Sequence, residues 1–270
     1  METLKLGPLD QAIQQLIRQA GIFAKREFEQ FSFSEVKYKA ENDPFTYVDV
    51  KTEEMLVEGC KPLIPNAGFI NEETGVHVSE SDYVWIIDPI DGTSNFTHGI
   101  PHFSISLALQ YQGNTLLGYV YEPVNGNMFR ARKGGGAFLN DKPISVSENS
   151  HLNVSLVGLG FPYGNGSWQK DYLRLVESVM KHAQGVRRMG SAALDLAYVA
   201  CGRFGAFFEF DLKPYDVAAG ILIVQEAGGN VSDFKGGDNY IFGRQVLATN
   251  GKVHDHLLGV IQEYSDLINI

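Results

Sequence analysis

The sequence predicts a layered α/β fold (α+β multilayer), in which helices and β-sheets pack face to face. Three observations support this prediction: apolar residues recur at helical spacing near the start of the chain, short alternating runs fill its middle, and strand-like and helix-like segments alternate in its second half. A chain of 270 residues accommodates two abutting subdomains. We place the boundary in the polar stretch 147–150, which gives subdomains 1–148 and 149–270.

The first half begins with two expected helices. Apolar residues at helical spacing between Leu9 and Ala24 predict an amphipathic helix, and a second helical stretch follows Thr46 and ends near Cys60. Alternation or short apolar runs then predict strands, separated by glycine-containing turns at 112–114, 125–126 and 134–136. The expected strands are 67–71, 83–87, 103–109, 115–121 and 128–131.

The second half alternates strands with helices. The pattern predicts a strand over 152–159, a Gly/Pro-rich loop over 160–164, a helix over 169–181, a helix of small residues over 192–200 that stops at Gly202, a strand over 206–210, and a helix over 216–227 closed by Gly228-Gly229.

Composition excludes several functional classes. A formal net charge of -10 argues against a protein that binds the backbone of nucleic acids. Two cysteines, Cys60 and Cys201, cannot form a disulfide framework and favour a reducing compartment. The sequence shows neither a signal peptide nor an apolar run long enough for a membrane span, so we expect a soluble cytoplasmic protein.

The run Asp88-Pro89-Ile90-Asp91-Gly92-Thr93 is the most informative part of the chain, because two acids and a Gly-Thr turn follow an apolar strand. A buried unpaired carboxylate is costly, and a bound cation compensates for it. The amides of Gly92, Thr93 and Ser94 could open a helix and meet an anion. Together these features predict metal-assisted phosphate chemistry, although the two acids could instead be a helix N-cap and a turn residue.

The same residues carry a family resemblance. The stretch from Trp85 to Thr93, continuing through Ser94-Asn95-Phe96-Thr97-His98-Gly99-Ile100-Pro101, resembles the signature of the inositol monophosphatase family, and Tyr215-Asp216-Val217-Ala218-Ala219-Gly220 resembles a second one. The resemblance extends from about residue 39 to residue 250. It implies a magnesium-dependent, lithium-sensitive phosphatase with stacked α-β-α-β-α layers that forms a homodimer.

The resemblance implies a set of metal ligands for Mg²⁺, namely Glu72, Asp88, Asp91, Asp216 and the backbone carbonyl of Ile90. It also implies that Asp49 and Thr93 orient the attacking water, so the expected catalytic residues are Asp49, Thr93 and Glu72. The chain departs from the family pattern at Asn71, where glycine is usual, and at Tyr215, where tryptophan is more frequent. Plainer interpretations remain: Asp49 and Asp216 as helix N-caps, and the acids at 72 and 73 as a surface pair, of which Glu73 is expected near the ligands or in solvent.

The residues expected to contact substrate are Gly92, Thr93, Gly190, Ser191, Ala192, Glu209 and Asp216, with Glu209 binding substrate hydroxyls as the resemblance implies. Phe161-Pro162-Tyr163 and Arg187-Arg188 are expected nearby, and one arginine could meet a second phosphate or be ordinary surface charge. Lys39 matches a family lysine near the site, but Lys37 competes for that position, and an ordinary solvated lysine is the favoured interpretation.

The expected function is therefore Mg²⁺-dependent hydrolysis of an inositol monophosphate by direct attack of an activated water on a small phosphorylated substrate. One alternative is a phosphatase of broad or dual specificity that accepts the 2′-phosphate of NADP, fructose 1,6-bisphosphate or 3′-phosphoadenosine 5′-phosphate. A cation-binding regulator without catalytic activity is the alternative from a different class.

Overall fold

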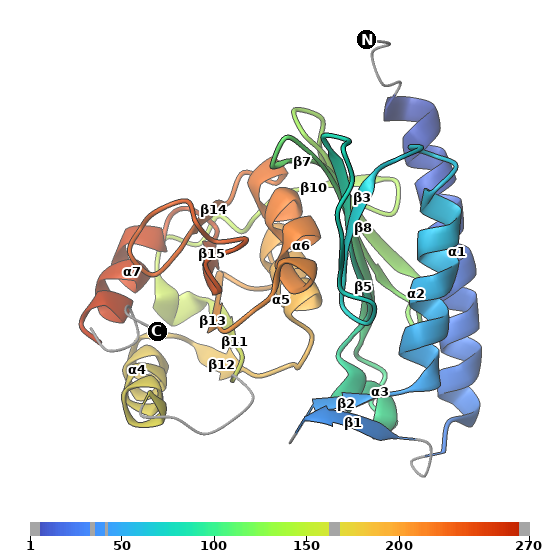
Figure 1. The fold of residues 1–270 in the computed structure, drawn as a ribbon. Helices are drawn as coiled ribbons and strands as arrows, with labels where there is room; N and C mark the ends of the chain where they lie inside the picture. Colours follow the sequence, from blue (N-terminus) through green and yellow to red (C-terminus); the bar gives the residue numbers. More distant parts are fainter. Residues whose placement is uncertain (1–5, 33–35, 41–42, 162–167, 265–270) are drawn as a thin grey trace.

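The computed structural model describes residues 6–32, 36–40, 43–161 and 168–264, which form five stacked layers (Figure 1). Helices α1 and α2 cover one face of a large sheet, α5 and α6 lie between this sheet and a smaller one, and α4 and α7 cover the outer face of the small sheet. The predicted α/β class and the α-β-α-β-α order of layers are both confirmed. No described helix is long and apolar enough to cross a membrane.

The large sheet contains eight described strands in the order β10-β9-β8-β7-β6-β5-β3-β4, with β3 and β5 parallel and the other neighbours antiparallel. A separate two-stranded sheet of β1 (Lys37–Ala40) and β2 (Asp43–Phe45) lies near the short helix α3 (Thr93–Thr97), at the ends of the strands of the large sheet. The outer helices are α1 (Leu6–Gln30) and α2 (Tyr47–Cys60), and the strands are β3 (Gly68–Asn71), β4 (Val76–His77), β5 (Tyr83–Asp91), β6 (Ser104–Tyr111), β7 (Asn114–Glu122), β8 (Asn127–Arg132), β9 (Gly136–Leu139) and β10 (Lys142–Ile144).

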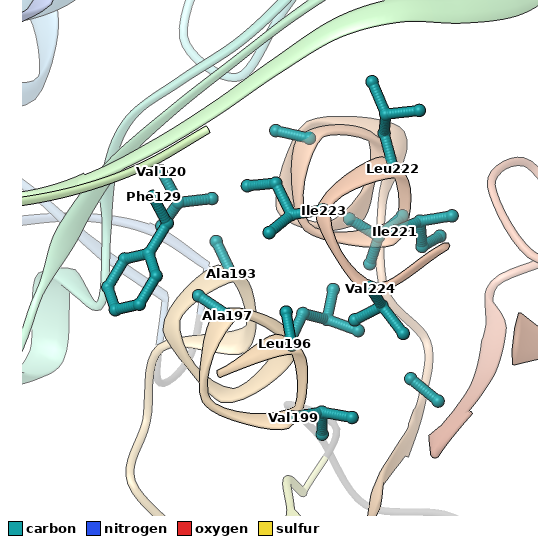
Figure 2. Close-up of a cluster of buried hydrophobic side chains, with 14 of the residues drawn as sticks. Val120, Phe129, Ala193, Leu196, Ala197, Val199, Ile221, Leu222, Ile223 and Val224 are labelled. Carbon is teal, nitrogen blue, oxygen red and sulfur yellow. The ribbon is translucent and has the colours of Figure 1, made fainter. Parts of the chain in front are cut away.

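The central helices α5 (Ala192–Ala200) and α6 (Pro214–Glu226) are apolar because each contacts elements on more than one side. Figure 2 shows their side chains packed together and against Val120 and Phe129 of the large sheet. Small residues permit this close packing: a Cβ at Gly118 of β7 would lie 2.7 Å from the carbonyl oxygen of Ala219 in α6. The central layer is therefore fixed against the sheet that carries Asp88 and Asp91.

The small sheet has the order β12-β11-β13-β15-β14 in the described part of the chain, with β11 parallel to β12 and β13, and β15 antiparallel to both of its neighbours. Its outer face packs against α4 (Gln169–His182) and α7 (His254–Gln262). The strands are β11 (Leu156–Leu159), β12 (Gly185–Arg187), β13 (Ala206–Phe210), β14 (Asn230–Ser232) and β15 (Gln245–Thr249).

Several expected boundaries are wrong. The segment 152–159 begins with a 3₁₀ turn, η2 (Leu152–Val154), and only β11 is a strand, because Leu152 turns its side chain into the core before the strand starts. Strand β5 continues through Asp91 with a register shift after Asp88 instead of ending at residue 87. Helix α6 starts two residues before Asp216, because Pro214 fits the first turn. The division at residue 148 stays a prediction.

Candidate active site

A pocket of about 330 Å³ opens where β5, α5, β13 and α6 meet. It contains most of the residues that the sequence singled out, although these come from segments far apart in the chain. Its lining includes Lys39, Glu72, Asp91, Gly92, Gly160, Phe161, Arg188, Gly190, Ser191, Ala192, Asp195, Glu209, Lys213, Tyr215 and Asp216. Of the residues expected around the pocket, Pro162 and Tyr163 lie outside the described residues.

Asp91 joins the end of β5 to the start of α5. Its carboxylate accepts hydrogen bonds from Ser191 Oγ at 2.5 Å, from the amides of Ala192 and Ala193 at 3.2 and 2.8 Å, and from Ser104 Oγ at 3.3 Å. A carboxylate at a helix N-terminus also interacts favourably with the helix dipole. Burial nevertheless raises the pKa of Asp91 to about 6, although these hydrogen bonds lower it.

The turn after Asp91 depends on Gly92, whose φ of +104° suits glycine and whose missing Cβ would lie 3.0 Å from the carbonyl oxygen of Gly190. This turn places Thr93 at the start of α3. Thr93 Oγ1 lies 3.0 Å from Asp49 Oδ1 and 3.0 Å from the carbonyl oxygen of Ile90, so the hydroxyl donates toward these acceptors. The Ile90 carbonyl, expected to face a metal, therefore also contacts Thr93.

The interpretation of Asp49 as a helix N-cap is wrong. Thr46 caps α2, and Asp49 at the third helical position accepts bonds to its Oδ2 from Thr46 N at 2.8 Å and Thr46 Oγ1 at 2.6 Å. This capping box leaves Asp49 Oδ1 for Thr93. Burial raises the pKa of Asp49, and the bonds from Thr46 and Thr93 oppose that rise. Asp216 has the same helical position in α6 and accepts from Lys213 N at 2.6 Å, so it too lies inside its helix.

The carboxylates around the pocket repel one another. Burial raises the pKa of Glu72 to about 7 with contributions from Asp49 and Glu73, against the lowering effect of Lys39. Burial and then the charge of Glu72 raise the pKa of Asp88 well above its ordinary value. Burial and then Asp91 do the same for Asp216. A cation bound among these groups would relieve the repulsion.

The chemistry of this donor set fits a hard divalent cation. All four expected side-chain ligands, Glu72, Asp88, Asp91 and Asp216, supply carboxylate oxygens, and the charge of Glu72 contributes to the raised pKa of Asp88. Among the described residues, no three His, Cys, Asp or Glu side chains converge tightly enough to enclose an ion by themselves. Carboxylate oxygens are ligands that Mg²⁺ prefers, and Mg²⁺ usually keeps several waters and binds substrate phosphate as well.

Lys39 lines the pocket and pairs with two of its acids, so it is not an isolated surface lysine, although the residue is exposed. Its Nζ lies 3.1 Å from Glu72 Oε1 and 2.5 Å from Glu73 Oε1. Burial opposes the charge of Lys39, but the two glutamates raise its pKa. Glu73 is likewise not a solvent-facing acid, because only 6% of its side chain is exposed.

Glu209, on β13, also lines the pocket. Burial raises its pKa to about 8, with Arg188 lowering and Asp91 raising it. Gly160 makes room for this side chain, since a Cβ there would lie 1.9 Å from the carboxyl carbon of Glu209. Arg187 and Arg188 are both exposed, but only Arg188 is among the lining residues of the pocket, and Arg187 donates to the carbonyl of Val186.

Asp195 is a pocket residue that sequence reasoning missed. It is 1% exposed, its Oδ1 has no partner among the described residues, and burial raises its pKa well above the ordinary value, with Glu209 and Asp91 adding to the rise. The available signal was the acid itself, the only charged residue in the apolar helix α5.

The chain is similar in sequence to known proteins over most of its length. A model described as the inositol monophosphatase family matches residues 5–266. A putative Nus factor SuhB of Neisseria meningitidis serogroup B is 44% identical over 227 residues, which cover 84% of this chain and 87% of that protein. An inositol-1-monophosphatase of Mesorhizobium japonicum is 38% identical over 250 residues, or 92% and 94% of the two chains.

The chain also superposes closely on solved structures. The extragenic suppressor protein SuhB from Bartonella henselae superposes with a TM-score of 0.91 at 35% identity, over 95% of this chain and 99% of that one. An inositol monophosphatase of Thermotoga maritima superposes with a TM-score of 0.87, also at 35% identity, over 97% and 99% of the two chains. The shared fold thus covers nearly the whole of both structures.

Proposed function

The chain belongs to the inositol monophosphatase family of phosphoric monoester hydrolases, and we propose that it hydrolyses myo-inositol 1-phosphate with the help of Mg²⁺. The observation that carries this proposal is the placement of the Thr93–Asp49 hydrogen bond beside the mutually repelling carboxylates of one pocket. Charged oxygen ligands and an oriented hydroxyl are what metal-assisted hydrolysis needs.

The proposed metal ligands are the carboxylates of Glu72, Asp88, Asp91 and Asp216 and the carbonyl oxygen of Ile90. Bound Mg²⁺ would neutralise phosphate charge and lower the pKa of an attacking water. The chain's own contribution is to hold these ligands in place, and Asp91 shows how: its hydrogen bonds from Ser191 and Ala193 fix the carboxylate against α5.

Thr93 and Asp49 orient the nucleophile in this proposal. With its proton directed at Asp49 Oδ1, Thr93 Oγ1 presents its lone pairs to the attacking water and accepts a proton from it. In the same step Asp49 takes the threonine proton, and burial favours the protonated form of Asp49 by raising its pKa. Attack by water is direct and forms no covalent enzyme intermediate.

The leaving group is proposed to lie toward Glu209. The polyol carries hydroxyls but no charge, which suits Glu209 and Asp195, two carboxyl side chains that line the pocket and can hydrogen-bond to hydroxyls. Glu209 binds substrate hydroxyls, and Gly190, Ser191 and Ala192 form the wall between the polyol and Asp91. Gly92, Thr93 and Asp216 complete the contacts around the substrate.

A broader specificity is the second candidate, and one observation favours it. Arg188 and Lys213 line the same pocket, so a second anionic group of a sugar bisphosphate or nucleotide would find a cation there.

The net charge of -10 and the free cysteines Cys60 and Cys201 support a cytoplasmic enzyme that binds no nucleic acid. Homodimer formation and inhibition by lithium complete the proposal.

A substrate panel tests the function. Phosphate release is measured with Mg²⁺ from myo-inositol 1-phosphate, fructose 1,6-bisphosphate, NADP and 3′-phosphoadenosine 5′-phosphate. We expect the highest kcat/KM for inositol 1-phosphate. A higher value for one of the other three compounds identifies the broader enzyme, and no release from any of them by folded, Mg²⁺-binding protein favours the non-catalytic cation binder.

A further inference from the structure

Glu53 is a buried carboxylate that the proposed chemistry does not use. It lies on α2, one helical turn after Asp49 and therefore on the same face of the helix. Only 1% of the residue is exposed, and no described lysine or arginine forms an ion pair with it. A buried charge of this kind needs hydrogen-bond donors as compensation.

Those donors all come from the turn that carries Glu72. Glu53 Oε2 accepts from Glu73 N at 2.8 Å, and Glu53 Oε1 accepts from Thr74 N at 2.9 Å and Thr74 Oγ1 at 2.6 Å. Charge-assisted bonds from two consecutive amides fix the backbone direction of a turn more strictly than one bond does. Glu53 is thus the anchor of residues 73 and 74 on α2.

Glu72 is held from the other side as well. Its amide donates to the carbonyl oxygen of Ile87 at 3.2 Å, next to Asp88 in β5. Asn71 closes the base of the turn, because its amide donates to Gly75 O at 3.0 Å. The backbone at Glu72 is therefore fixed between β5, which carries Asp88, and α2, which carries Asp49 and Glu53.

We propose that Glu53 is a positioning residue, which holds the 72–75 turn so that the Glu72 carboxylate faces the cation-binding pocket. This inference rests on the proposed function in one respect, namely that Glu72 binds the cation. Glu53 itself contacts neither substrate nor cation, because its two oxygens are occupied by the turn.

The test is Mn²⁺ binding, followed by electron paramagnetic resonance of the free ion, in wild type and Glu53→Gln. The NH₂ group of the glutamine would face an N–H donor of the 72–75 turn, so at least one hydrogen bond that anchors the turn on α2 would be lost. We expect Mn²⁺ to bind about 10- to 100-fold more weakly, as for other residues that orient a metal ligand. The Mg²⁺ concentration for half-maximal activity should rise in parallel, while kcat recovers at saturating Mg²⁺.

Glu54→Gln is the matched control, because Glu54 is the neighbouring residue on α2, is exposed and forms an ion pair with Lys51 at 2.8 Å. It should bind Mn²⁺ like wild type. Thr74→Val is the second variant if Glu53→Gln does not fold: it removes one of the three donors and should weaken Mn²⁺ binding by a smaller factor.

A double substitution separates positioning from general damage. In a Glu72→Gln background the ligand is already lost, so adding Glu53→Gln should change Mn²⁺ binding little. If Glu53→Gln weakens Mn²⁺ binding equally in the wild-type and Glu72→Gln backgrounds, or does not weaken it at all, the positioning role of Glu53 is overturned while the proposed function still stands. A wild-type protein that binds no Mn²⁺ overturns the proposed function, and this inference with it.

Discussion

The substitution Asp91→Asn should remove activity without unfolding the protein, and the structure gives the magnitude of the effect on stability. The pKa of Asp91 rises from 3.8 to about 6 in the folded protein without metal. At pH 8 this rise means that the ionised side chain destabilises the folded state by roughly 3 kcal/mol relative to its protonated form. Asparagine has nearly the same shape and avoids this cost because it is neutral.

The same substitution has an opposing cost. Two amides and two hydroxyls donate to the Asp91 carboxylate, and the asparagine NH₂ group would face some of these donors. Leaving one buried donor unpaired costs about 1–3 kcal/mol. The two effects nearly cancel, so we expect the metal-free variant to unfold within about 6 °C of the wild-type Tm.

Activity has no such compensation, because asparagine cannot supply a charged ligand. We expect phosphate release to fall at least about 100-fold at any Mg²⁺ concentration, and added Mg²⁺ to raise the Tm of the variant much less than that of wild type. Asp238→Asn, an exposed aspartate far along the chain from the ligands, is the matched control and should behave like wild type. Near-normal activity, or a full Mg²⁺-induced rise in Tm, would refute the assignment of Asp91 as a ligand.

Three further predictions concern the pocket. Thr93→Val should lower kcat with little change in Mg²⁺ binding, while Thr93→Ser, which keeps the hydroxyl, should retain much of the wild-type kcat. Equal kcat values for the two variants would contradict a proton transfer through the Thr93 hydroxyl. Gly160→Ala should displace Glu209 and raise the KM for inositol phosphate in steady-state kinetics. In a Glu209→Ala background the same substitution should leave KM unchanged. A rise in KM that persists there would mean that Gly160→Ala disturbs the pocket without acting through Glu209. Folding raises the pKa values of Glu72 (to about 7) and Asp91 (to about 6), so the stability that these groups contribute to the metal-free protein is present at low pH and is lost as pH rises from about 4 through 7. Thermal unfolding without metal should therefore give a lower Tm at pH 8 than at pH 5.5, and added Mg²⁺ should raise the Tm more at pH 8. A higher metal-free Tm at pH 8 would count against this electrostatic account.

Much of the fold could be predicted where local signals are strong. Helix α5 begins at the expected residue because Ser191 caps it, and it ends before Gly202, which has the left-handed φ of +77°. Strand β13 also matches its prediction. By contrast, β1, β2, β4, β14, β15 and α7 were not predicted. The strands among them have five residues or fewer, too short for a clear alternation, and their pairing partners lie elsewhere in the chain.

The site was predictable to the extent that its residues belong to continuous motifs. Asp88, Asp91 and Thr93 stand within six residues, and the apolar strand before them indicates burial. The partners that complete the site are distant: Lys39 reaches Glu72 across 33 residues. Nothing in the spacing of residues 37 and 39 shows which lysine makes that contact, and only the folded chain decides between them.

Glu53 illustrates a second limit. Its partners are backbone amides and one hydroxyl of a turn 20 residues away, and backbone groups have no sequence signature. In the sequence it is one of several acids on an amphipathic helix, next to the exposed Glu54. Its burial follows from packing between α2 and the turn, which sequence periodicity alone does not specify.

The most direct test of the central claim is phosphate release from myo-inositol 1-phosphate by wild-type protein after treatment with a chelator and after Mg²⁺ is restored. The account predicts no release from the metal-free protein and recovery with Mg²⁺, since the role proposed for the carboxylates around the pocket is to bind a cation and not to attack phosphate themselves. Release that continues at an undiminished rate in the chelated protein would contradict it.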